Sequence, residues 1–186
     1  MQTAALEGGF ADLARQSAKG FRACLDAMAR PGTIHAVGGA LPPAPMSVAA
    51  GVAVLVLADA TTPLHLAGRH DCGAVRDWIT FHTGAPLVRP GEAVFALGDW
   101  AALDLAAFAL GTPEYPDRSA TLIVEMPDLL DRGARLTGPG IRDTAALNLP
   151  EVAFFQRNAA LFPLGLDFLF TCGDRLAALP RTTRVS

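Results

Sequence analysis

Residues 162–184, Phe162-Pro-Leu-Gly-Leu-Asp-Phe-Leu-Phe-Thr-Cys-Gly-Asp-Arg-Leu-Ala-Ala-Leu-Pro-Arg-Thr-Thr-Arg184, carry the pattern that decides the fold. The apolar runs Leu166–Cys172 and Ala177–Leu179 flank the turn-forming pair Gly173-Asp174. Two strand-like runs on either side of such a pair predict a β-hairpin. The C-terminal part of the chain is therefore expected to end in paired strands.

The N-terminal half carries helical patterns instead. Residues 10–30 repeat apolar side chains at spacings of three and four, and Pro31-Gly32 ends that pattern. Periodicity does not separate a buried helix from a buried strand over residues 48–57. The valines favour a strand, whereas the alanines and Ser47 as a cap favour a helix, and we predict the helix. The other predicted elements are strands at 64–67, 93–97, 120–126, 135–137 and 144–149, and helices that begin at Asp71, Asp99 and Pro150.

Helices thus alternate with strands early in the chain, and strands crowd its later part. This order predicts an α/β fold with a mixed β-sheet flanked by helices. A length of 186 residues without a linker or repeat predicts a single domain over residues 1–186.

The amino-acid composition of the chain indicates which classes of partner it does not bind. Hydrophobic residues make up 51% of the chain and charged residues 18%, which indicates a folded protein. The net charge of −3, without a cluster of basic residues, indicates no nucleic-acid partner. The longest apolar run, residues 48–58, is too short to span a bilayer, and no secretion signal is visible. With three widely spaced cysteines, these features predict a cytoplasmic protein without a membrane partner.

The basic residues are 14 arginines and one lysine, Lys19. Schiff-base chemistry therefore has one candidate residue, and the helical pattern places Lys19 on a polar face. The four histidines show no metal-ligand spacing, and no nucleophile–base pair is apparent. We expect no cofactor, no metal site and no catalytic residue.

Three segments are candidates for contact with an anion or a partner. The turn Gly138-Pro-Gly140, followed by Arg142, either forms an anion-binding concavity or sets the register of a hairpin. Arg118 is the residue of the segment 116–119 most available to a phosphate or a partner. The strip Arg181, Thr182 and Thr183 suits a phosphate or carboxylate, or else pairs with an acidic side chain of its own fold.

Several blocks of this sequence together resemble the PhnH family, the H subunit of the bacterial carbon–phosphorus lyase core complex. Three of them lie late in the chain and two lie earlier, so that the resemblance runs from about residue 10 to the C-terminus. The blocks are Leu136-Thr-Gly-Pro-Gly-Ile141, Phe162-Pro-Leu-Gly-Leu-Asp167, Leu179-Pro-Arg-Thr-Thr-Arg184, Phe21-Arg-Ala-Cys-Leu-Asp-Ala-Met-Ala-Arg-Pro-Gly-Thr-Ile34 and Pro116-Asp-Arg-Ser-Ala-Thr-Leu122.

The resemblance implies a domain similar in fold to pyridoxal-phosphate-dependent transferases that does not bind their cofactor. It also implies a homodimer that joins the G, I and J subunits. Their complex couples alkylphosphonate to ribose in place of the adenine of ATP, giving a ribose 1-phosphonate 5-triphosphate, with activity ascribed mainly to the I subunit. We therefore expect a supporting subunit of this complex. A stand-alone enzyme and a ligand-sensing module, each acting on a phosphorylated small molecule, remain as alternatives.

Overall fold

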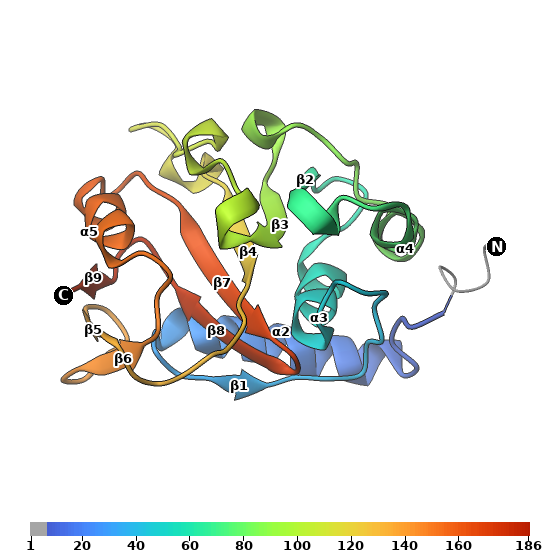
Figure 1. Cartoon of the computed structure of the whole chain (residues 1–186), viewed down its shortest axis with the longest axis horizontal. Coiled ribbons are helices and arrows are strands. Elements are labelled where there is room, and N and C mark those ends of the chain that lie inside the picture. Colours follow the sequence, from blue (N-terminus) through green and yellow to red (C-terminus); the bar gives the residue numbers. More distant parts are fainter. Residues whose placement is uncertain (1–6) are drawn as a thin grey trace.

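The computed structural model describes residues 7–186 and is built around a six-stranded sheet with the order β1-β8-β7-β4-β3-β2 (Figure 1). β2, β3, β4 and β7 run parallel, whereas β8 is antiparallel to β7 and β1 is antiparallel to β8. The sheet is therefore mixed, as predicted. Its strands are β1 (His35–Ala36), β2 (Leu64–Leu66), β3 (Phe95–Asp99), β4 (Thr121–Glu125), β7 (Asp167–Cys172) and β8 (Arg175–Leu179).

Both faces of this sheet are covered. α2 (Leu13–Ala29), α3 (Val48–Leu57) and α4 (Gly73–Thr83) contribute to the apolar cluster on one face. α5 (Val152–Ala160) and a second, three-stranded sheet cover the other face (Figure 1). That sheet has the order β6-β5-β9 and consists of β5 (Ala134–Thr137), β6 (Ala145–Leu147) and β9 (Arg184–Val185). Strand residues alternate between the two cores, as a sheet buried on both sides requires.

The predicted helix over residues 48–57 and the predicted C-terminal hairpin are confirmed. α3 begins after Ser47, whose hydroxyl accepts a hydrogen bond from the Ala50 N–H at 3.1 Å. The C-terminal hairpin forms around Gly173, with Cys172 paired to Arg175. Its two strands lie inside the sheet and not at an edge, because β7 also pairs with β4 and β8 with β1.

The helix predicted after Asp99 is wrong. Residues 100–102 and 105–107 form two short 3₁₀ turns, and the Asp99 carboxylate contacts Arg69 and caps no helix. Leu103 and Phe108 are both buried in the core. Five residues apart on an α-helix, they would point about 140° away from each other, so irregular backbone is needed to bury both.

Two smaller predictions also need correction. Asp71 does not cap α4; Cys72 holds that position, and Asp71 pairs with Arg76 instead. The face of α2 that the spacing assigns to the core is only partly buried, since Phe21 and Leu25 remain about half exposed. Among residues 7–186, no helix is both long and apolar enough to cross a membrane.

The predicted Gly138-Pro-Gly140 turn packs against the C-terminal end of α2. Gly140 has a φ of +80°, and a Cβ atom placed there would lie 1.9 Å from the Ala29 carbonyl oxygen. Neither the conformation nor the distance tolerates a side chain. This glycine therefore joins the small sheet to α2 by close backbone contact.

We expect Gly140→Ala to lower the free energy of unfolding by about 2–4 kcal/mol, through strain at positive φ and overpacking. Gly38→Ala is the matched control, because a Cβ atom added at Gly38 would meet no atom within 4 Å and φ is not positive there. Urea unfolding of both variants measures the difference. Equal stability of the two variants would contradict the close contact.

Candidate functional site

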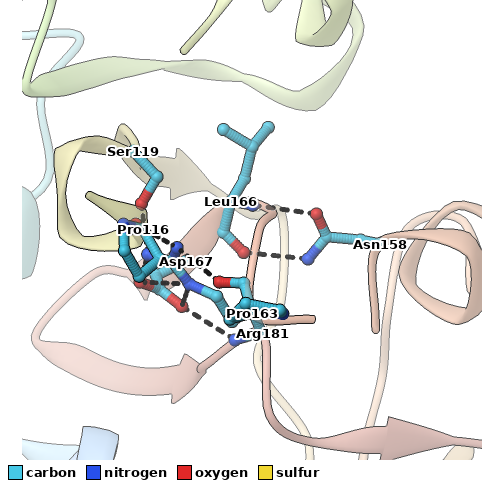
Figure 2. A network of polar contacts seen from close by, with 7 residues as sticks. All are labelled: Pro116, Ser119, Asn158, Pro163, Leu166, Asp167 and Arg181. Atoms are coloured by element: carbon cyan, nitrogen blue, oxygen red, sulfur yellow. Dashed lines mark hydrogen bonds and ion pairs between the residues drawn. The ribbon is translucent and has the colours of Figure 1, made fainter. Parts of the chain in front are cut away.

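Arg181, one of the predicted contact residues, lies at the centre of a polar network inside the chain (Figure 2). Its Nε donates to both carboxylate oxygens of Asp167, at 3.1 and 3.2 Å. Nη1 donates to the carbonyls of Pro116 at 2.7 Å and Pro163 at 3.4 Å, and Nη2 donates to Ser119 and Asp167. All five guanidinium N–H groups therefore have acceptors within the chain.

This network joins segments that are distant in sequence. Asp167 begins β7 and also accepts from the Arg181 backbone N–H at 2.8 Å. Next to it, the Asn158 amide donates to the Leu166 carbonyl and accepts from the Leu166 N–H, both at 2.8 Å (Figure 2). The Arg181 and Asp167 side chains are only 13% and 15% exposed. These contacts favour the internal alternative for Arg181, whereas contact with an outside anion or partner stays a prediction.

A cleft of about 430 Å³ lies beside the network and brings several of the predicted residues together. It forms because β5 pairs with β9, so that Thr137 lies opposite Arg184. Arg184 is exposed, and the residues that line the cleft carry no acidic side chain. The lining residues are Gly138, Pro139, Ala159, Phe162, Arg181, Thr182 and Arg184.

The remaining predicted residues lie elsewhere. Thr183 is buried, and its hydroxyl has no hydrogen-bond partner in the described part of the chain. Gly140 faces α2, and Arg142 is exposed without lining the cleft. Arg118 is also exposed and lies over the Tyr115 ring, 4.0 Å from its centroid. The structure therefore unites the glycine turn with the C-terminal strip but not with Arg118 or Arg142.

A second polar cluster, which the sequence did not predict, lies at the carboxyl ends of the parallel strands. Asp99, Glu125 and Thr171 are in register across β3, β4 and β7. Arg69 holds Asp99 through two hydrogen bonds of 2.8 Å. His70, fully buried, lies between the two acidic residues: Nδ1 is 3.9 Å from Asp99 Oδ2, and Nε2 is 3.9 Å from Glu125 Oε1. We call these five residues the carboxyl-edge cluster.

Burial governs the protonation of this cluster. It lowers the pKa of His70, against the opposing effects of Asp99 and of a contact with the Pro45 backbone. That contact does not meet hydrogen-bond geometry, and neither ring nitrogen has a hydrogen-bond partner among the described residues. Burial raises the pKa of Glu125, which hydrogen bonds from Ser47 and Thr171 partly offset. Across residues 7–186, no group of three or more potential ligands is placed to hold a metal ion.

The register between β3, β4 and β7 brings the residues of this cluster together, whereas their spacing in the sequence does not. Asp99 and Glu125 are the last residues of β3 and β4, and parallel strands bring their carboxyl ends to one edge. The available signal was an acidic residue near the carboxyl end of each of two successive predicted strands, residues 93–97 and 120–126. His70 gave none, because it lies in a short 3₁₀ turn.

Comparison with known proteins covers almost the whole chain. The family model described as bacterial phosphonate metabolism protein (PhnH) matches residues 8–186. The alpha-D-ribose 1-methylphosphonate 5-triphosphate synthase subunit PhnH of Rhizobium meliloti (strain 1021) is 39% identical over 196 aligned residues, which cover 99% of this chain and 97% of that protein. A putative C-P lyase subunit protein HtxG of Stutzerimonas stutzeri is 36% identical over 105 residues, about half of each chain.

We expect Arg181→Ala to lower the free energy of unfolding by about 2–4 kcal/mol, because it leaves the Asp167 carboxylate largely buried and unpaired. Arg184→Ala, in the same cleft but exposed, should change stability by less than about 0.5 kcal/mol. Urea unfolding compares the two variants. If Arg181→Ala were as stable as Arg184→Ala, the network would not be a fold element.

Proposed function

Since the chain belongs to the PhnH family of bacterial phosphonate metabolism proteins, we propose that it is a subunit of a ribose 1-alkylphosphonate 5-triphosphate synthase within a carbon–phosphorus lyase core complex. It would support formation of this product from ATP and alkylphosphonate without providing the catalytic groups. The observation that carries the proposal is the 39% identity to a synthase subunit along nearly the full length of both chains.

The geometry supports a structural role over a catalytic one. The Arg181 guanidinium directs its donors to acceptors within the chain. At the carboxyl edge, where open parallel sheets usually bind ligands, the Glu125 side chain is 6% exposed and His70 is fully buried. The Arg181 network and the carboxyl-edge cluster therefore stabilise the fold, and neither presents its polar groups to a substrate.

The proposed partners are a second copy of the chain and the G, I and J subunits. α2 supplies a surface for the second copy, since Phe21 and Leu25 are 50% and 52% exposed. An apolar groove of about 190 Å³ runs beside them and is also lined by Met28, Leu57 and Phe95. Exposed apolar residues beside an apolar groove are typical of an interface. The free cysteines fit a cytoplasmic complex.

A second candidate function is supported by the cleft beside Arg181. Arg184 and Thr182 face a volume of about 430 Å³ without an acidic neighbour in its lining, which suits a phosphorylated small molecule. The chain would then be a ligand-sensing module or an enzyme in its own right. Because Arg184 is exposed, Arg184→Ala separates this function from the stability of the fold.

We expect this chain to restore growth on methylphosphonate as sole phosphorus source to a bacterium whose own PhnH subunit has been deleted. The purified chain alone should not transfer ribose from ATP to methylphosphonate. Arg184→Ala should support growth as well as the unaltered chain does. Turnover by the isolated protein that Arg184→Ala abolishes would favour the second candidate, and failure to restore growth would contradict the first.

We also expect a homodimer, which light scattering would detect as about twice the chain mass of 19.4 kDa. Changing Phe21 and Leu25 together to Asp should give a folded monomer, because two charges would be buried at the interface. Leu41→Asp is the control, since Leu41 is 76% exposed and lies outside α2. A monomeric unaltered chain at micromolar concentration would contradict the homodimer.

A further inference from the structure

The N-terminus of α3 holds a carboxylate of the chain itself. The Ser47 N–H donates to Glu125 Oε1 at 2.6 Å, and the Thr171 hydroxyl donates to Glu125 Oε2 at 3.1 Å. The first N–H groups of a helix have no partner within the helix and carry a partial positive charge, which makes this position a natural anion site. α3 has 10 residues, and its Ala49 and Ala50 N–H groups donate to the Gly173 carbonyl and the Ser47 hydroxyl. Glu125 takes the Ser47 N–H, the place at this helix end that an anionic ligand would take.

A buried imidazole points to the same place. His70 is fully buried and lies near the Pro45 backbone, but that contact does not meet hydrogen-bond geometry, so neither ring nitrogen has a hydrogen-bond partner among residues 7–186. Nε2 lies 3.9 Å from Glu125 Oε1, beyond hydrogen-bond distance. Buried polar atoms without a hydrogen-bond partner are rare in folded proteins, because leaving them unpaired costs free energy. The imidazole is thus aimed at the site without being satisfied by the carboxylate that fills it.

The surroundings are electrostatically suited to one anion. Asp99 lies on the far side of the His70 ring, and Arg69 neutralises it through two hydrogen bonds of 2.8 Å. Glu125 is therefore the carboxylate in the cluster without a cationic partner at hydrogen-bond distance. Its stabilising contacts are the helix end and a hydroxyl, the groups that hold bound oxyanions in other proteins.

We propose that the N-terminus of α3, with Thr171 and His70, forms a site for a small oxyanion whose resident ligand is the chain's own Glu125. External oxyanions are kept out because this carboxylate already occupies the site. Removing the carboxylate opens a site that accepts a free oxyanion of similar size. This inference does not depend on the proposed function, since it concerns an interaction within one chain.

The test is chemical rescue of Glu125→Ala by acetate. The substitution removes the two oxygens and two carbons beyond Cβ, and acetate consists of two carbons and two oxygens. We expect the melting temperature of Glu125→Ala to fall by about 5–10 °C. Adding acetate at constant ionic strength, against chloride, should raise it again by about 3 °C or more. Inorganic phosphate, which is bulkier, should have a smaller effect.

Three controls make the response specific. The unaltered chain and Glu125→Gln, whose amide fills the same space, should not respond to acetate. Asn158→Ala removes a buried amide at the opposite end of the sheet and should be destabilised without responding. Adding His70→Ala to Glu125→Ala should weaken the acetate response if the imidazole contacts the anion.

The outcomes separate clearly. Rescue of Glu125→Ala alone supports the site, and its loss with His70→Ala places the imidazole in it. A folded Glu125→Ala that ignores acetate, or an equal response from Asn158→Ala, overturns the proposal. If Glu125→Ala does not fold in chloride, refolding from urea with acetate replaces the melting measurement, and no recovery of folded protein overturns the proposal equally.

Discussion

The two ends of β4 and β7 impose the constraint on which the rest of the structure depends. When both faces of a set of parallel strands are covered, polar side chains can reach solvent or polar partners mainly at the two ends of the strands. At the amino ends, Asp167 is paired with the Arg181 guanidinium. At the carboxyl ends, Glu125 and Thr171 are in register and hydrogen-bonded, and the first turn of α3 completes the site through Ser47. The apolar clusters on the two faces of the sheet lie between these two polar ends.

Short-range sequence patterns predicted the elements whose conformation depends mainly on residues close in sequence. Apolar spacing predicted α2, and Gly173-Asp174 predicted the hairpin. The Ser47 cap and the alanines favoured α3, although the apolar pattern there also allowed a strand. The prediction for the segment after Asp99 was wrong because tertiary packing determines its conformation. Leu103 and Phe108 are both buried in the core. The partial exposure of α2 was equally invisible, because it depends on which neighbours cover a helix and not on its own periodicity.

The polar clusters could be predicted only in part. The donor-rich strip with Arg181 was recognisable, but whether it faces inward depends on Asp167 and Ser119, which the fold brings to it from 14 and 62 residues away. The carboxyl-edge cluster needed the register of three strands and the position of a 3₁₀ turn. No pattern within a short window contains that information, so the candidate residues were visible one by one and their arrangement was not.

The place of β7 in the sheet has a consequence for biosynthesis. β7 lies between β4 and β8, although residues 1–166 leave the ribosome before it. Until β7 emerges, β4 has an unpaired edge, and the helices on one face have only part of a sheet to pack on. The domain can therefore complete its fold only after residues 167–185 have been made. A chain that stops earlier therefore lacks a central strand and leaves the edge of β4 unpaired.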